Sequence, residues 1–372
     1  MGPMDASLSP QDRHYLARAI ELAKRGWGSV HPNPLVGCVL VKDGTVVGEG
    51  WHQEYGGPHA EIHAMRQAGD RMSGATAYVS LEPCNHHGQT PPCSDALLQA
   101  GIGRLVYASQ DPGVVSGGGA EALRGAGVEV VGPVLLPHDS RRENPSFYHN
   151  QVLEATYLAL KLAQTLDGKI SERRGQRTDI TGPQALRETH RLRAGFDAVL
   201  VGSGTVEVDD PLLTVREDVA RRKPPARIVL DTSCRISPRA RLFQDVPETP
   251  LIVFTGEDSR ELAIGRLEDA GATVHPVRRG PDGVDIDAVL AICWETRIRS
   301  IFCEGGGRLA RALLRGGHVR RLYLFVAPFV LGEEGVSGLP AGHSKAWWEG
   351  WTPAFPPFPF GRDVLLTMDR TA

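Results

Sequence analysis

The feature that most constrains this chain is a set of metal-binding and acid–base side chains between residues 59 and 93. The set consists of His59, Cys84 and Cys93, with Glu61 two residues after the histidine. Imidazole and thiolate are preferred ligands of Zn²⁺, and a catalytic zinc site has three protein ligands and one open position. The fold must therefore bring three separate side chains to one point. The open position would hold a water that is activated at neutral pH, and Glu61 would transfer protons.

Two helices are expected to begin at this point. The run from His59 to Gly69 follows Pro58 and predicts one helix, and Cys93 directly precedes a second predicted helix over residues 94–100. The positive ends of two helix dipoles would then converge on the metal and favour thiolate and hydroxide.

The spacing leaves two kinds of zinc site open. A His-x-Glu motif with a later Pro-Cys and a second Cys is typical of zinc-dependent base deaminases, although here eight residues separate the two cysteines. A closed structural site would instead need a fourth ligand, which His86 or His87 could supply. The catalytic interpretation is preferred, because a structural site needs neither Glu61 nor the Pro-Cys context.

Length and composition exclude several classes of protein. A chain of 372 residues, with 41% hydrophobic and 23% charged residues, is expected to form two globular domains. A formal charge of −3 argues against a nucleic-acid partner. No apolar run reaches the roughly 20 residues of a membrane span, and no signal-peptide pattern is present, so we expect a cytoplasmic protein. Six cysteines in so long a chain do not indicate a disulfide framework.

The order of predicted elements indicates two α/β domains. In residues 1–153 a helix over 9–24 and a hairpin at Asp43-Gly44 precede alternating helices and strands, which predicts an α/β/α sandwich. A connecting helix is expected over 139–153. Residues 154–372 restart the alternation with a strand over 157–163 and predict a second α/β domain. A segment rich in Pro and aromatic residues, 347–360, is interpreted as surface packing.

Two glycine turns in the second half suggest a phosphate-bearing ligand. Gly202-Ser203-Gly204-Thr205 and Gly305-Gly306-Gly307 each follow a predicted strand, where a backbone without Cβ atoms can approach an anion. A standard dinucleotide fingerprint is not complete, because no acidic residue follows about 20 positions later.

With these residues identified, nearly the whole chain resembles the family of bifunctional riboflavin-biosynthesis deaminase/reductases. The matching stretches in the first half are His31-Pro32-Asn33-Pro34, Pro58-His59-Ala60-Glu61 and Leu81-Glu82-Pro83-Cys84 through Thr90-Pro91-Pro92-Cys93. In the second half they are Lys161-Leu162-Ala163, Leu166-Asp167-Gly168-Lys169, Ile180-Thr181, Asp209-Asp210-Pro211, Leu213-Thr214-Val215-Arg216 and Glu304-Gly305-Gly306.

The resemblance implies two fused enzymes. The N-terminal domain (1–153) would have a cytidine-deaminase-like α/β/α fold and act as a zinc-dependent hydrolase that removes the 2-amino group of a diamino-pyrimidinone ribosyl phosphate. The C-terminal domain (154–372) would have a dihydrofolate-reductase-like α/β fold and act as an NADPH-dependent oxidoreductase that converts the ribosyl group to a ribityl chain. A homo-oligomer is also implied.

The resemblance also assigns roles by position. His59, Cys84 and Cys93 would hold zinc, and Glu61 would be the proton shuttle. The residues implied to read the pyrimidine are Asn33, His52 and Asp111. Those implied to hold the substrate of the reductase are Arg193, Leu213, Arg216 and Glu304, the two arginines suiting a phosphate. Those implied to line NADPH are Ala163, Thr205, Asp209, Thr232, Gly306, Gly307, Arg308 and Leu309.

Four positions depart from the family pattern. Gln89 replaces a cation and Gly113 replaces an asparagine in the deaminase half, while Arg177 and Asp179 replace a serine and a tryptophan in the reductase half. An alternative therefore remains, in which the chain is a paralogue that deaminates another pyrimidine and has an impaired reductase domain.

Overall fold

The computed structural model describes residues 8–86, 91–216, 219, 221–339 and 348–371. Residues through Glu154 form one compact unit, and most residues from Ala155 onward form a second. The boundary expected from the sequence was 153/154, and the assignment of one activity to each part stays a prediction. Within the described residues, no helix has the length and apolar character that a membrane crossing requires.

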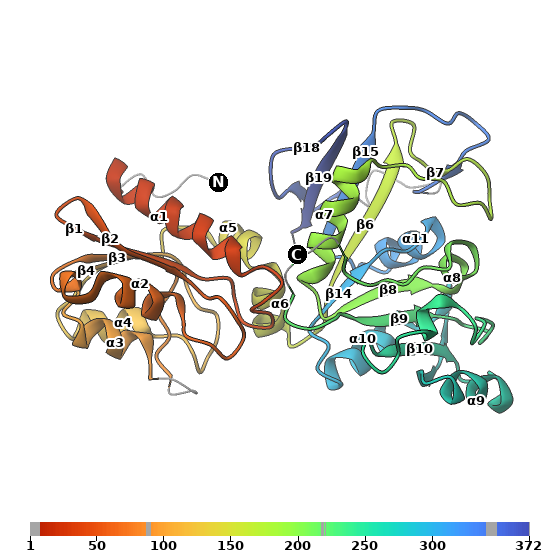
Figure 1. Cartoon of the computed structure of the whole chain (residues 1–372), viewed down its shortest axis with the longest axis horizontal. Helices are drawn as coiled ribbons and strands as arrows, with labels where there is room; N and C mark the ends of the chain where they lie inside the picture. Colours follow the sequence, from red (N-terminus) through yellow and green to blue (C-terminus); the bar gives the residue numbers. More distant parts are fainter. Residues whose placement is uncertain (1–7, 87–90, 217–218, 220, 340–347, 372) are drawn as a thin grey trace. The chain divides into compact units, whose positions relative to one another are not determined.

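The first unit is a three-layer α/β/α sandwich, as predicted (Figure 1). Its strands follow the order β2-β1-β3-β4-β5, with β3, β4 and β5 parallel and β1 antiparallel to both of its neighbours. Its elements are α1 (Pro10–Ala23), η1 (Lys24–Gly26), β1 (Gly37–Lys42), β2 (Thr45–Trp51), α2 (Ala60–Ala68), η2 (Gly69–Met72), β3 (Thr76–Leu81), α3 (Cys93–Gln99), β4 (Arg104–Ser109), α4 (Gly119–Gly125), β5 (Glu129–Val131), α5 (Pro137–Glu143) and α6 (Pro145–Leu153).

Two apolar cores hold the sandwich together. On one face of the sheet, Leu16 and Ile20 of α1 pack against Val39 and Val106. On the other face, α2, α3 and α4 contribute the buried side chains Ala60, Ala64, Leu97, Ala120 and Leu123. Alternating strand residues are therefore buried on both sides, as a central sheet requires.

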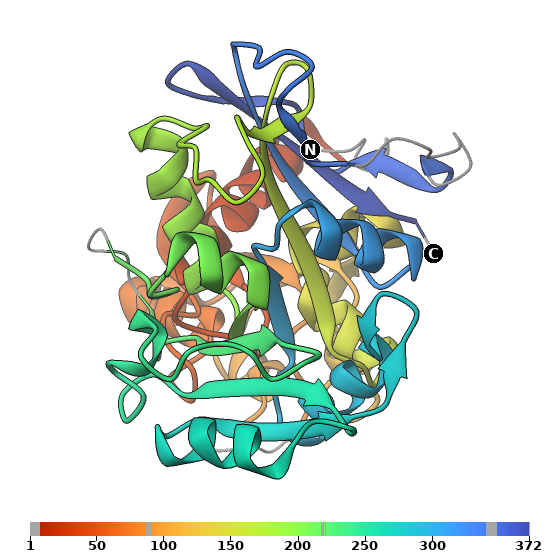
Figure 2. The same cartoon turned by 90° about the vertical axis from the view of Figure 1, so that its right-hand side faces the viewer.

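The second unit is built on a sheet in the order β11-β10-β9-β8-β14-β6-β15-β19-β17, with β18 also paired to β19 (Figures 1 and 2). The strands from β11 to β15 are parallel, and β19 is antiparallel to β15. The longer elements are β6 (Tyr157–Thr165), α7 (Pro183–Ala194), β8 (Ala198–Gly202), α8 (Ser203–Asp209), β9 (Ala226–Leu230), η3 (Arg241–Phe243), β10 (Leu251–Gly256), α9 (Glu261–Asp269), β11 (Thr273–Val277), α10 (Ile286–Glu295), β14 (Ser300–Cys303), α11 (Gly307–Arg315), β15 (Arg321–Ala327) and β19 (Asp363–Arg370).

The short strands are β7 (Lys169–Ser171), β12 (Arg279–Gly280), β13 (Gly283–Val284), β16 (Val336–Ser337), β17 (Trp351–Pro353) and β18 (Phe358–Phe360). Helices cover both faces of the large sheet. Leu267 of α9 packs on one face with Val229 and Val253, whereas Val289 of α10 and Leu313 of α11 pack on the other.

The prediction of one connecting helix over 139–153 is wrong in one respect, because the segment forms two helices, α5 and α6. The chain breaks at Asn144, where φ is −132° and ψ is 58°. A residue before proline avoids the α region, and Pro145 imposes that restriction here. The Asn144 side chain then bonds Leu35, accepting from its N–H at 2.7 Å and donating to its carbonyl at 3.0 Å.

Two further segments differ from the prediction. The turn at Gly202 opens the helix α8, which the sequence pattern did not predict. In the Pro-rich segment, interpreted from the sequence as surface packing, Trp348 and Trp351 pack against the core, and β17 and β18 pair with β19. Proline is tolerated in such edge strands, so the composition hid them. Trp347 lies outside the described residues.

Candidate functional site

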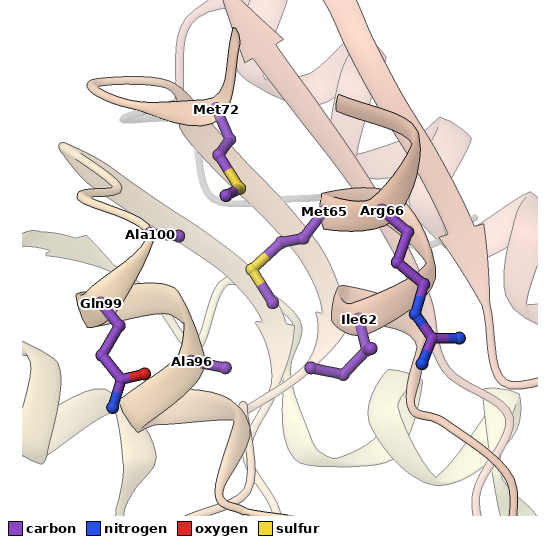
Figure 3. Close-up of a pocket in the computed structure, with 7 residues that line it drawn as sticks. All are labelled: Ile62, Met65, Arg66, Met72, Ala96, Gln99 and Ala100. Atoms are coloured by element: carbon purple, nitrogen blue, oxygen red, sulfur yellow. The ribbon is translucent and has the colours of Figure 1, made fainter. Parts of the chain in front are cut away.

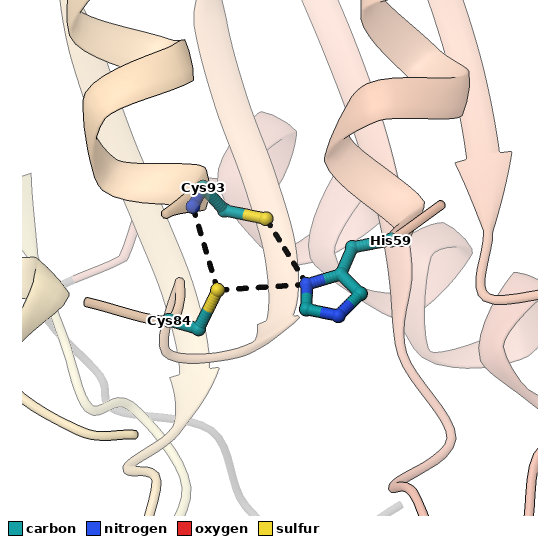
Figure 4. Close-up of side chains that lie close together, drawn as sticks. All are labelled: His59, Cys84 and Cys93. Atoms are coloured by element: carbon teal, nitrogen blue, oxygen red, sulfur yellow. Dashed lines mark hydrogen bonds between the residues drawn. The ribbon is translucent and has the colours of Figure 1, made fainter. Parts of the chain in front are cut away.

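Three metal-binding side chains meet in the first unit (Figure 4). His59 caps the N-terminus of α2, Cys84 lies in the loop after β3, and Cys93 is the first residue of α3. The Nδ1 atom of His59 is 3.2 Å from Sγ of Cys93 and 3.5 Å from Sγ of Cys84. All three ligand atoms lie within 4.8 Å of one another. The predicted ligands are therefore brought together.

These separations fit a zinc ion. Tetrahedral bonds of about 2.3 Å to sulfur and about 2.0 Å to nitrogen would place the two kinds of ligand atom about 3.5 Å apart. The two nitrogen–sulfur distances, 3.2 and 3.5 Å, are close to this value. Among the described residues, the metal-binding group contains only these three side chains, and His86 does not join them. His87, the other fourth ligand considered, lies outside the described residues.

Small residues set the position of α2, and with it the position of His59. A Cβ atom at Gly50 would lie 2.3 Å from the carbonyl oxygen of Ala60, and one at Gly48 would lie 2.1 Å from that of Ala64. A larger residue at Gly48 or Gly50 would push α2 outward, because real Cβ atoms do not approach backbone oxygens this closely. The first turn of α2 is therefore fixed against the sheet.

The two thiols are electrostatically different. Cys84 accepts hydrogen bonds from the thiol and N–H of Cys93 and from His59, and these donors lower the pKa of the Cys84 thiol to about 4. The same contact with the Cys84 thiolate, together with burial, raises the pKa of Cys93. The bond to Cys84 also raises the pKa of His59. The pocket thus stabilises a thiolate at neutral pH, which is the form that binds metal.

Glu61 lies beside this group without belonging to it. Its side chain is buried, with 3% of the residue exposed, and it contacts the thiol of Cys93. Burial, with the nearby charge of Cys84, raises the pKa of its carboxyl group. A carboxyl group with a raised pKa binds a proton more readily, so it is suited to accept and return protons.

Two of the residues expected to read a pyrimidine are bonded to each other. The amide nitrogen of Asn33 is 3.1 Å from Nε2 of His52, whose Nδ1 is 3.1 Å from the carbonyl oxygen of Pro58. If Nδ1 carries the proton, His52 donates to Pro58 and accepts from Asn33, and burial favours this neutral ring by lowering the pKa of His52. The His52 ring also meets that of His59 edge to face at 5.5 Å.

Asp111, the third residue of this set, follows β4. It is 8% exposed, and burial raises its pKa, helped by the charges of Glu82 and Cys84. The N–H of Asp111 donates to the carboxylate of Glu82, two residues before the ligand Cys84, so Asp111 lies beside the Cys84 loop. Gly113, one of the four departures from the family pattern, donates its N–H to Asp111 at 2.8 Å. Gln89, another departure, lies outside the described residues.

An open groove lies between α2 and α3 but lacks this chemistry (Figure 3). Its volume is about 410 Å³, and it is lined by Ile62, Met65, Arg66, Met72, Ala96, Gln99 and Ala100. None of the metal-binding residues lines it. The groove is mainly apolar, so it is not the site of the acid–base chemistry.

In the second unit, both predicted glycine turns open helices at one edge of the sheet. Gly202 caps α8 after β8, and Gly306 caps α11 after β14. Because β8 and β14 are adjacent and parallel, the starts of both helices lie at the same edge. Thr205 lies in α8, and Gly307, Arg308 and Leu309 lie in the first turn of α11. N–H groups at such helix starts suit a phosphate.

The other residues predicted to line NADPH are spread along the same sheet. Ala163 lies in β6, Thr232 follows β9, and Asp209 is the last residue of α8. Burial raises the pKa of Asp209, and Arg177 opposes this shift. Arg177 itself bonds Asp179 at 3.0 Å, so these two departures from the family pattern form an exposed ion pair. The negative charge of Asp179 is thereby offset in part.

Two of the four predicted substrate residues of the second unit, Arg193 and Glu304, form a largely buried ion pair. Arg193 donates to Glu304 at 2.7–2.8 Å and also to the carbonyl oxygen of Thr214. The Arg193 and Glu304 side chains are 8% and 12% exposed. The guanidinium of Arg193 is therefore occupied by protein groups, whereas Arg216 is exposed and its backbone N–H donates to Nδ1 of His190 at 3.3 Å.

Two positions near this pair qualify the sequence interpretation. Leu213 is buried and has a φ of 57°, an uncommon conformation for a non-glycine residue. Lys161, which carried part of the family resemblance but received no role, is half-buried near Glu304 and Arg193. Burial lowers the pKa of Lys161, and Glu304 opposes the shift. A lysine in a strand of otherwise apolar residues was the sequence signal for it.

Comparison with known proteins finds two matching family models. Residues 9–109 match the cytidine and deoxycytidylate deaminase zinc-binding region, and residues 156–346 match the RibD C-terminal domain. The chain is 42% identical over 344 residues to the riboflavin biosynthesis protein RibD of Escherichia coli, with 89% of this chain and 92% of the relative covered. It is 41% identical to that of Aquifex aeolicus, with 87% and 88% covered.

Solved structures give the same result. The structure of Acinetobacter baumannii RibD matches with a TM-score of 0.82 at 33% identity, covering 97% of this chain and 99% of the other. A diaminohydroxyphosphoribosylaminopyrimidine deaminase/5-amino-6-(5-phosphoribosylamino)uracil reductase from Thermotoga maritima matches with a TM-score of 0.81 at 32% identity and the same coverage.

Proposed function

The chain belongs to the RibD family of riboflavin-biosynthesis proteins, and we propose from this premise which residues perform its two reactions. It is a bifunctional enzyme with a cytidine-deaminase-like domain and a reductase domain of the family's α/β fold, and its cofactors are zinc and NADPH. Similarity over both units does not favour a specialised paralogue with a relict reductase. We assign deamination to residues 1–153 and reduction to 154–372.

The deaminase site consists of His59, Cys84 and Cys93 around Glu61, and the convergence of these four side chains is the observation that carries the proposal. Zinc held by the three ligands would supply a Lewis acid that activates water at neutral pH. Glu61 accepts a proton from the attacking water and returns protons to the ring nitrogen and the departing amine. Water and substrate thus give ammonia and the 2-oxo ring.

Around this centre, the chain supplies groups that orient the pyrimidine. The side-chain nitrogen of Asn33 donates to His52. The side-chain oxygen of Asn33 can then accept from a ring or amino N–H of the substrate. Asp111 would contribute a carboxylate that can accept from an amino group of the substrate. Because His52 is held in one orientation by Pro58, the Asn33 amide has a fixed direction.

In the reductase, NADPH would supply hydride to C1 of the opened ribosyl group. The starts of α8 and α11 would hold the cofactor phosphates, and Thr232, after β9, and Ala163, in β6, would line the cofactor on either side of them. Arg193 holds Glu304 in place through its buried ion pair, so we assign Arg193 to positioning and Arg216 to the substrate phosphate.

The direct test is incubation with the diamino-pyrimidinone ribosyl phosphate, with and without NADPH, followed by mass analysis. Deamination replaces NH with O and adds about 1 Da, and reduction adds about 2 Da more. An unchanged mass without NADPH would refute the deaminase assignment. A product that stops after the first gain in the presence of NADPH would refute the reductase assignment, and titration of NADPH binding would then show whether the cofactor site is intact.

The enzyme acts on a small phosphorylated pyrimidine. We propose that it works in the cytoplasm, as a homo-oligomer, without a nucleic-acid or membrane partner. The net charge of −3 supports the absence of a nucleic-acid partner. Sedimentation of the purified protein tests the oligomer, and a monomeric mass at working concentration would overturn that part.

A further inference from the structure

A second buried carboxylate, Glu82, lies two residues before the ligand Cys84. It is 4% exposed, and each hydrogen bond that its carboxylate accepts from the described residues comes from a backbone N–H group. Oε1 accepts from Gly118 and Ala120, each at 3.1 Å, and Oε2 accepts from Asp111 at 3.3 Å. Both oxygens are therefore used to bind one segment, residues 111–120, which runs from the end of β4 into α4.

This segment is also docked on the Cys84 loop by two other contacts. The N–H of Asn85 donates to the carbonyl oxygen of Ser116 at 2.9 Å. A Cβ atom at Gly119 would lie 1.9 Å from the carbonyl oxygen of Pro83, so only glycine allows α4 to begin this close to the loop. Glu82 and these two backbone contacts thus hold the same segment, which has little freedom to shift.

We propose that Glu82 is a positioning residue of the deaminase, which fixes the 111–120 segment so that Asp111 faces the pyrimidine. This inference rests on the proposed function, in which Asp111 contacts the substrate. Glu82 binds the backbone of Asp111 itself, and Gly113 then bonds the Asp111 carboxylate at 2.8 Å. The direction of the Asp111 side chain is set by these two bonds.

The chemistry requires a carboxylate of this length. All three partners of Glu82 are donors, and an ionised carboxylate is an acceptor at both oxygens. Glutamine has the same shape, but its amide nitrogen would face at least one N–H and leave that group unsatisfied. Aspartate would withdraw the carboxylate by about 1.5 Å, the length of one carbon–carbon bond.

The test uses the full-length, zinc-loaded enzyme with Glu82→Gln, and Glu121→Gln as the matched control. Glu121 lies in α4, its side chain is 80% exposed, and it pairs only with Arg124 in the same helix. We expect Glu82→Gln to lower deaminase kcat/KM by about tenfold to a hundredfold. Because Asp111 binds substrate, most of the loss should be a higher KM. Zinc content and the reductase activity of the same chain should be unchanged.

The outcomes separate this inference from the proposed function. A parent enzyme without deaminase activity would sink the proposed function itself. If the parent is active and the KM of Glu82→Gln lies within about twofold of the parent's, only the role of Glu82 is overturned. Loss of zinc from the variant, or a fall in its kcat at unchanged KM, would also overturn that role. If Glu82→Gln does not yield folded protein, Gly119→Ala decides, since its Cβ would meet the carbonyl oxygen of Pro83 and displace the same segment between two N–H donors of Glu82. A normal KM in that variant would overturn the proposal.

Discussion

Replacing Glu61 with glutamine should separate metal binding from catalysis. Glutamine matches glutamate in shape, so it fits the buried position, where only 3% of the residue is exposed. It cannot take up a proton. A positioned acid–base group contributes about 10²–10⁴ to the rate, and a buried position excludes the bulk water that could replace it. We therefore expect the upper half of this range, a loss of about 10³–10⁴ in kcat, or roughly 4–5.5 kcal/mol of barrier.

The assay measures ammonia release from the diamino-pyrimidinone substrate, together with zinc per chain by atomic absorption. Zinc should be retained, because Glu61 is not one of the three ligands. Reductase activity on the deaminated compound serves as an internal control for folding. Glu129→Gln is the matched variant, since this carboxylate is exposed and pairs with Arg104. Near-normal ammonia release by Glu61→Gln would remove Glu61 from the mechanism.

Three other changes test the remaining structure. Cys84→Ala should abolish zinc binding and deamination but spare reduction, and full zinc retention would contradict the ligand set. A second change concerns Asp12 in the first unit. Burial raises the pKa of its carboxyl group, but hydrogen bonds from Arg104 and two hydroxyl groups outweigh burial and lower this pKa from 3.8 to about 2. Asp12 therefore contributes about 2 kcal/mol of stability above pH 4, which is lost as the pH falls to about 2. The difference in unfolding free energy between the parent and Asp12→Asn, measured by hydrogen exchange in β3, should shrink between pH 6 and pH 3, and a constant difference would refute it. Arg193→Met should leave Glu304 without this partner and destabilise the second unit by roughly 3–5 kcal/mol; an unchanged urea midpoint for unfolding of this unit, followed by hydrogen exchange in β6 and β14, would contradict this.

Local sequence patterns predicted most elements of the first unit because their signals are short-range. Ser9 caps α1 by accepting from the N–H of Asp12, and Asp43-Gly44 joins β1 to β2 as the hairpin pattern requires. The break at Asn144 was missed even though Pro145 signals it. The two edge strands β17 and β18 were missed because proline and aromatic residues suggested a segment without strands.

The candidate metal site was predicted because its chemistry needs particular residue types. Among the described residues, no other group of histidines, cysteines and carboxylates converges as His59, Cys84 and Cys93 do. The contribution of Glu61 followed from the same motif. Glu82, in contrast, carried no signal of its own role, since its partners are backbone N–H groups that any sequence possesses.

The sequence by itself determined the two α/β units, the metal-binding residues and the glycine turns, because periodicity, capping and ligand chemistry are written in neighbouring residues. Only the tertiary structure decided which distant groups meet. Strand β14 inserts between β6 and β8, although its residues come about a hundred positions after β8, and this order places Glu304 against Arg193. Partners across a sheet are chosen by the burial of whole faces, a property of the folded chain that no local stretch encodes.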